Sequence, residues 1–200
     1  NFSMLPEILD SNEIEGVNSI LLDLGFSLNQ LKNGKRGFSF NKNEPLDMRM
    51  DIRNDLTAED MINSFKQDEL ADIFFKYGEE RFSRRIARRI VEKRNISAIK
   101  TSQQLAQIVK DALPVKVIYK QKIHPATKVF QALRISVNKE LEVLETFMQK
   151  APSLLLEGGR LCVISFHSLE DRIVKQAIRK FDQGCTCPKE LPRCLCGFVP

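Results

Sequence analysis

The chain begins with a helix start followed by a short apolar run. Ser3-Met4-Leu5-Pro6-Glu7 is typical of the first turn of a helix, and an apolar burst extends from Val17 to Gly25. The burst is short, ends in Asp and Gly, and follows a helix, as a buried parallel strand of an α/β sheet does. We therefore predict that residues 1–31 form part of an α/β domain.

The middle zone, residues 32–125, has helical patterns and no convincing strand. It opens with a loop rich in Gly and Asn, and Thr57-Ala58-Glu59-Asp60 then has the spacing of a capping box. Helical periodicity covers residues 68–94, where Gly78 can break it, and a further helix is predicted between Thr101 and Pro114. This zone is predicted to be a helical insertion.

The third zone, residues 126–200, returns to the α/β pattern. Its apolar positions predict one long amphipathic helix over residues 126–150. A tight turn at 154–160, a strand at 161–166 and a helix at 173–181 are predicted to follow. The two α/β zones can lie side by side in space, which predicts one sheet interrupted by the helical insert.

The net charge of +5 is a mild indication of a polyanionic partner, and the distribution of charge is more informative. Residues 81–94 carry seven basic residues and a single acid, Glu92. On a helix, five arginines of this segment fall within a sector of roughly 140°, opposite an apolar stripe. These are Arg81, Arg84, Arg85, Arg88 and Arg89.

Most charge runs are solvated surface, which is the first interpretation of this arginine face. The face contains arginine and no lysine, and the guanidinium fork matches the geometry of phosphate. We therefore predict that the arginine face binds the phosphates of a nucleic acid.

Polar residues follow both predicted strands, namely Asp23 after the first and Ser165 and His167 after the second. Ligands of open α/β sheets bind beyond the carboxyl ends of the strands, so these three are candidate catalytic or binding residues. Two structural roles stay open beside that hypothesis. Asp23 can cap a turn, and His167 can cap the helix that follows it.

Four of the five cysteines lie close together near the end of the sequence: Cys185, Cys187, Cys194 and Cys196. Four thiolates can bind zinc in a tetrahedral site, but a single residue separates the members of each pair, against the usual two to four. We predict no metal site and keep zinc at this loop as the alternative. The fifth, Cys162, is predicted to be a small core residue.

Six segments together closely resemble one protein family, the bacterial 16S ribosomal RNA cytosine-N4 methyltransferases of the MraW type. The resemblance runs from Asn1 to at least Phe181. The segments that carry it, in chain order, are Leu22-Asp23-Leu24-Gly25-Phe26-Ser27, Arg36-Gly37-Phe38-Ser39-Phe40, Pro45-Leu46-Asp47-Met48-Arg49-Met50-Asp51, Tyr77-Gly78-Glu79-Glu80-Arg81, Phe130-Gln131-Ala132-Leu133-Arg134-Ile135 and Ser165-Phe166-His167-Ser168-Leu169-Glu170-Asp171-Arg172.

This resemblance implies an α/β fold, with a Rossmann-like methyltransferase sheet that is incomplete here and is interrupted by an all-helical domain for RNA recognition. It implies transfer of a methyl group from S-adenosylmethionine to the N4 amine of a cytidine in the decoding region of 16S rRNA, within the small ribosomal subunit. The family's cofactor contacts match Phe2, Asp23 and Gln30.

The family's Gly-rich cofactor loop and its ribose-binding acid would lie upstream, and the final strands are also missing. We therefore expect this fragment to be inactive by itself and the intact protein to be active. A DNA cytosine-N4 methyltransferase is disfavoured because an Asp-Pro-Pro-Tyr loop is missing. A non-catalytic RNA-binding protein stays an alternative.

No apolar run reaches membrane-span length and no signal peptide opens the chain, so we expect a cytoplasmic protein without a membrane partner. The sequence makes no prediction of oligomeric state.

Overall fold

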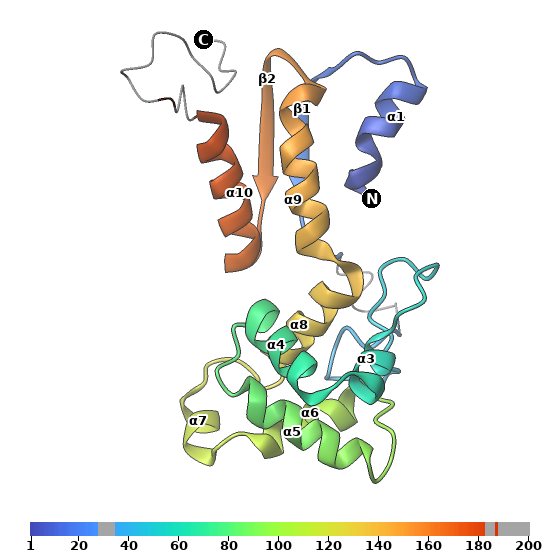
Figure 1. The fold of residues 1–200 in the computed structure, drawn as a ribbon, viewed down its shortest axis with the longest axis vertical. Helices are drawn as coiled ribbons and strands as arrows, with labels where there is room; N and C mark the ends of the chain where they lie inside the picture. The colour runs from blue at the N-terminus through green and yellow to red at the C-terminus, as the bar shows by residue number, and fades with distance from the viewer. Residues whose placement is uncertain (28–34, 183–186, 188–200) are drawn as a thin grey trace. The chain divides into compact units, whose positions relative to one another are not determined.

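The computed structural model describes residues 1–27, 35–182 and 187, and the chain divides into two compact units (Figure 1). The sheet unit combines Asn1–Gly25 with Leu141–Pro200. The helical unit is Phe26–Glu140. The fold is therefore mixed α/β, and each unit has its own hydrophobic core.

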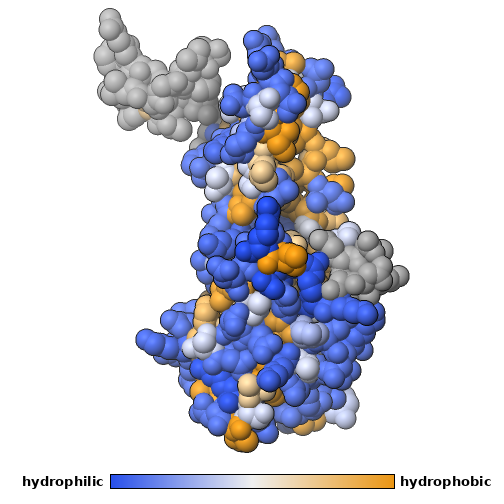
Figure 2. Space-filling model, turned by 90° about the vertical axis from the view of Figure 1, so that its right-hand side faces the viewer, coloured by the Kyte–Doolittle hydropathy of each residue, from blue (hydrophilic) through white to orange (hydrophobic). Residues whose placement is uncertain are grey.

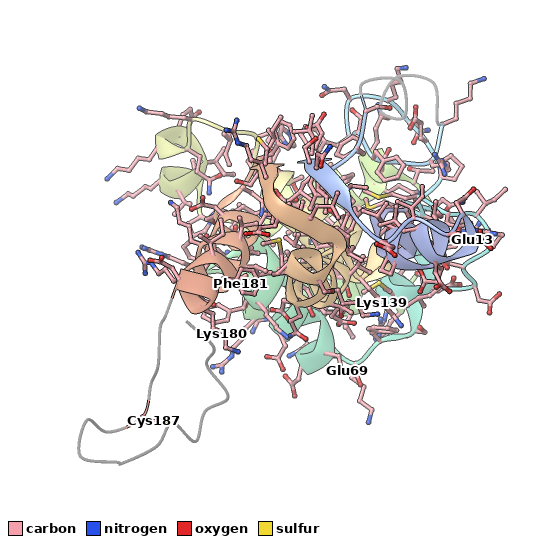
Figure 3. The ribbon with its side chains drawn as sticks, turned by 90° about the horizontal axis from the view of Figure 1, so that it is seen from above. Glu13, Glu69, Lys139, Lys180, Phe181 and Cys187 are labelled. Atoms are coloured by element: carbon pink, nitrogen blue, oxygen red, sulfur yellow. The ribbon has the colours of Figure 1, made fainter. Side chains whose placement is uncertain are left out.

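The sheet unit is built from two parallel strands and the helices around them. Its elements are η1 (Phe2–Met4), α1 (Leu5–Ser11), β1 (Val17–Asp23), α9 (Glu140–Lys150), η2 (Ala151–Leu154), β2 (Leu155–Ile164) and α10 (Ser168–Asp182). The predicted helix start is confirmed, with Pro6 in the first turn of α1. Figure 3 shows the last turn of α10, which carries Lys180 and Phe181.

Strands β1 and β2 pair in parallel, as their apolar patterns predict. Continuous pairing runs from Ser19 opposite Arg160 to Asp23 opposite Ile164. The prediction of a turn at 154–160 is wrong, because residues 155–160 belong to β2. Its glycines explain the difference. Gly158 has a φ of +74°, and the register shifts here, so the segment that resembles a turn is an irregularity within a strand.

The core of the sheet unit lies on one face of the two strands. Ile20 and Leu22 of β1 pack there with Leu144 and Phe147 of α9. Side chains alternate along a strand, so their neighbours point to the opposite face. Leu21 is 67% exposed on that face and its register partner is Cys162, which is also exposed. The prediction that Cys162 is a core residue is therefore wrong.

The helical unit contains α3 (Ala58–Ser64), α4 (Gln67–Gly78), α5 (Ser83–Arg94), α6 (Ser102–Ala112), α7 (Val115–Lys120) and α8 (Thr127–Asn138). Both predicted helix starts are confirmed. Thr57 and Asp60 form a capping box at α3, and Thr101 and Gln104 form one at α6. On the face drawn in Figure 2 the surface of this unit is mostly hydrophilic, since the apolar stripes of its helices face one shared core.

The segment between residue 35 and α3 is irregular but well anchored. Leu46 and Met48 are fully buried in the helical core. Beside them the Arg49 guanidinium donates two hydrogen bonds to Asp47, at 2.7 and 2.9 Å. These bonds hold the pKa of the Asp47 carboxyl below its ordinary value. The loop is thus fixed by burial and by a bidentate ion pair.

The predicted helix over residues 126–150 is two helices, α8 and α9, divided at Lys139. Lys139 adopts the left-handed conformation, with a φ of +51°. Asn138 accepts a hydrogen bond from the Met50 amide at 2.7 Å and donates one to the Met48 carbonyl at 2.8 Å. Asn138 thus ends α8 by binding the backbone of the anchored loop, whose partners lie far away in sequence.

No helix in the described parts of the chain is both long and apolar enough to cross a membrane.

Helices α4 and α8 approach each other closely at Gly78. A Cβ placed on Gly78 would lie 2.5 Å from the Lys128 carbonyl oxygen, which is backbone and has little freedom to move. Lys128 also donates a hydrogen bond from Nζ to the Glu79 carbonyl at 2.9 Å. The end of α4 is therefore seated on the first turn of α8.

We predict that Gly78→Ala destabilises the protein by about 1–3 kcal/mol, because overpacking of the α4–α8 contact outweighs the gain of about 1 kcal/mol in helix propensity. Chemical denaturation monitored by circular dichroism measures the change. Lys76→Ala, at an exposed position of the same helix, is the control and should change stability by less than about 0.5 kcal/mol. An unfolding midpoint that rises in Gly78→Ala would contradict the close contact.

Candidate functional site

The carboxyl ends of β1 and β2 lie at the same edge of the sheet unit. Asp23 is opposite Ile164 in the register, and the Leu24 amide donates to the Ile164 carbonyl at 3.1 Å. Gly25 follows with a φ of +90°, and a Cβ placed on it would lie 3.6 Å from the Phe166 ring. The structure therefore brings together two segments that are far apart in sequence, at the edge where α/β sheets bind ligands.

Of the predicted site residues at this edge, Asp23 ends β1 with an exposed side chain, and Ser165 is half-buried just after β2. Phe2 belongs to the same unit, where its ring meets the Phe147 ring edge-on at 5.3 Å between centroids. Gln30 lies outside the described residues.

His167 and Glu170 contact each other at the start of α10. The Glu170 side chain is 3% exposed, and its Oε2 accepts a hydrogen bond from the Phe166 amide at 2.9 Å. His167 Nδ1 accepts one from the Glu170 amide at 3.4 Å. Nε2 lies 3.2 Å from Glu170 Oε1, close enough for attraction but poorly aligned for a hydrogen bond.

This pair fixes the backbone that leads from β2 into α10. His167 caps the helix, as one of the two sequence interpretations holds, and the helix starts at Ser168 rather than at the predicted residue 173. Glu170 was not predicted from the sequence. Its signal was the spacing of three residues after a helix cap, which is the spacing of a capping box.

The arginine face lies in the helical unit, on α5 and the turn before it. Ile86, Ala87 and Ile90 are fully buried, as the apolar stripe predicts. All five arginines of the face are at least partly exposed, and Arg89 is the most covered of them: Arg81, Arg84, Arg85, Arg88 and Arg89. The helix therefore packs by its stripe and presents its guanidinium groups to solvent.

The five arginines differ in their ionic partners. Arg88 and Arg89 lie 3.7 and 3.1 Å from the carboxylate of Glu92. Arg81, Arg84 and Arg85 have no ion pair within the described part of the chain. The free positive charge is thus concentrated at the start of α5.

Cys187 is half-buried, and its three neighbours Cys185, Cys194 and Cys196 lie outside the described residues. Among residues 1–27, 35–182 and 187, no group of three or more His, Cys, Asp or Glu side chains is arranged to hold a metal ion.

Comparison with known proteins gives relatives along the whole chain. The Ribosomal RNA small subunit methyltransferase H of Desulforapulum autotrophicum is 60% identical over 200 residues, which are 100% of this chain and 64% of that protein. The protein of the same name from Desulfosudis oleivorans is 52% identical over 197 residues, 98% of this chain and 63% of that one. The protein of the same name from Geobacter sulfurreducens is 52% identical over 200 residues, which are 100% of this chain and 64% of that protein.

The chain thus spans about 64% of the length of these relatives. The MraW methylase family matches residues 1–200. Since that match covers every residue, the chain belongs to the MraW methylase family.

Proposed function

We propose that the whole protein is an S-adenosylmethionine-dependent methyltransferase of ribosomal RNA, acting in the cytoplasm on the N4 amine of a cytidine in the decoding region of 16S rRNA. The observation that carries the proposal is the family match over residues 1–200, with relatives named as small-subunit rRNA methyltransferases at up to 60% identity. The paired strand ends support it, because they place Asp23 and Ser165 at one edge of a parallel sheet.

Two of the residues present suit the cofactor by their chemistry. Asp23 offers an exposed carboxylate at the strand end, and Phe2 offers an aromatic ring in the same unit. We infer that both contact S-adenosylmethionine, with Gln30 as a third contact. When bound, S-adenosylmethionine supplies an electrophilic methyl group on a sulfonium, a good leaving group that requires no metal.

The task left to the protein is to orient the target amine. The lone pair of a cytosine N4 amine is delocalised into the ring, so the amine is a poor nucleophile and positioning supplies much of the rate. Oxygen atoms at the sheet edge, from Asp23 or Ser165, can accept hydrogen bonds from the amine and fix its direction. His167 is the weaker candidate, because both of its ring nitrogens face Glu170. We assign His167 a positioning role.

The helical unit supports a second part of the proposal, which is that it inserts into the methyltransferase domain and recognises RNA. It has its own buried core. Its arginine face offers the donor geometry that phosphate requires. We propose that this face binds the phosphates of the ribosomal substrate.

The first prediction from this proposal tests the reaction. Purified whole protein given cofactor with a labelled methyl group should label 16S rRNA in isolated small ribosomal subunits and leave duplex DNA unlabelled. Mass spectrometry of digested RNA should find the methyl group on the N4 atom of cytidine. Labelled DNA would favour a DNA cytosine-N4 methyltransferase, and RNA binding without any label would favour a non-catalytic RNA-binding protein.

The second prediction concerns the cofactor. Asp23→Ala in the whole protein should weaken S-adenosylmethionine binding at least about tenfold, the effect of one charge-assisted hydrogen bond. Isothermal titration calorimetry measures this. Asp10→Ala, which removes an exposed carboxylate from α1, is the matched control and should bind normally. Unchanged affinity in a folded Asp23→Ala protein would remove Asp23 from the site.

The third prediction concerns the arginine face. Cations that bind phosphates release counterions, so removing one such cation lowers the log–log salt slope of RNA affinity by just under one unit. The double variant Arg84→Gln with Arg88→Gln should weaken binding to small-subunit RNA and lower the slope by roughly one to two units. Its cofactor affinity should not change.

The matched control removes the same charge from the sheet unit. Arg179→Gln with Lys180→Gln changes two exposed basic residues in the last turn of α10. This control should keep the wild-type slope. Equal slopes in all three proteins would show that the arginine face is solvated surface.

A further inference from the structure

A hollow opens on the helical unit between α4 and the start of α5. Its volume is about 510 Å³, within the range of roughly 300–1,000 Å³ that small-ligand sites occupy. We call it the α4–α5 hollow. Its lining residues are Ala71, Asp72, Phe75, Arg81, Phe82, Ser83, Arg84 and Arg85.

The lining of the α4–α5 hollow is suited to anions because three arginines belong to it. Arg81, Arg84 and Arg85 line it, and these are the three arginines of the face that lack an ion pair in the described part of the chain. Asp72 is the one acid of the lining, and it lies beyond ion-pair distance of all three. The hollow therefore has a net positive charge, and within the described residues no protein acceptor pairs with the guanidinium groups of these three arginines.

The hollow also contains an exposed aromatic ring. Phe75 is 64% exposed, whereas its neighbour Phe74 is fully buried in the core. Burial of such a side chain would stabilise the fold, so its exposure forgoes stability. Within the described residues, no aromatic ring or cation stacks on Phe75. One ring face is thus available to a flat ligand.

We propose that the α4–α5 hollow binds one nucleotide of a single-stranded RNA segment, with its base stacked on Phe75 and its phosphate bound by Arg81, Arg84 and Arg85. A flat ring next to an anion is the combination that this lining recognises. Single-stranded RNA presents both groups, whereas the bases of a duplex are stacked on one another and cannot reach Phe75. The inference rests on the proposed RNA substrate and adds a specific subsite to it.

The test separates stacking from charge by their different salt dependence. Phe75→Leu removes the ring and keeps apolar bulk and helix propensity. We expect it to weaken binding of a single-stranded cytidine octamer at least about fivefold, with an unchanged salt slope. Phe75→Tyr keeps the ring and should bind within about twofold of wild type. Arg85→Gln should weaken binding and also lower the slope.

A fluorescent variant tests the contact directly. These 200 residues contain no tryptophan, and the emission of the indole added by Phe75→Trp is measured as the difference from the unsubstituted whole protein. Stacking of a base on the indole should quench its emission when the single-stranded octamer binds. A duplex of the same length should bind the arginines without quenching.

Three results would overturn the subsite. The first is wild-type affinity of Phe75→Leu for the single-stranded octamer, and the second is a loss of affinity in Phe75→Leu that is equal for duplex and single strand. The third is an indole emission in Phe75→Trp that the octamer does not quench. If the protein shows any of these results and still methylates rRNA, the proposed subsite is rejected and the proposed function is not. If the unsubstituted protein neither binds nor methylates RNA, the proposed function fails as well. A midpoint of thermal unfolding equal to that of the wild type, measured for each variant, excludes a general loss of structure.

Discussion

The parallel pairing of β1 with β2 is the constraint on which the candidate cofactor site depends. Parallel strands cannot be joined by a tight turn, so a long connection must separate them, and here the helical unit lies within it. The pairing sets Asp23 opposite Ile164, so the polar residues after each strand meet at one edge. A shift of register by one residue would exchange the two faces, exposing Ile20 and Leu22 and burying Asp23 and Leu21.

The edge stays ordered because a buried carboxylate holds the turn after β2. Glu170 is 3% exposed, so its carboxylate loses most of its hydration, which costs free energy. The hydrogen bond from the Phe166 amide and the nearby His167 ring offset part of this cost. Its position in the first turn of α10 adds the favourable end of the helix dipole. The backbone around Ser165 and Phe166 is therefore fixed by the helix that follows, and a site built there is preorganised.

Local patterns could be predicted from the sequence, and features that depend on distant partners could not. The strand pair, the capping box at Thr57, the helix start at Thr101 and the exposure of the arginine face follow from side-chain period and hydrogen-bonding chemistry. The division between α8 and α9 does not, because the side chain of Asn138 finds its partners on Met48 and Met50. Phe75 was missed for a related reason: an apolar residue on a helix predicts burial, and its exposure depends on how α4 packs.

The start of α5 has two arginines at a helix end where the dipole favours acids. Helices α6, α7 and α8 also have no acid in their first turn. Helices α3, α4 and α10 have acids in their first turn, where carboxylates offset the positive end of the helix dipole. The first turn of α5 contains Arg84 and Arg85, no acid and no side-chain cap. Like charges at a helix end cost stability, by roughly 0.3–1 kcal/mol each. The single acid of this helix, Glu92, lies at the other end, beside Arg88 and Arg89. Local rules are broken mainly where function requires it, so this arrangement supports an anionic ligand at the start of α5.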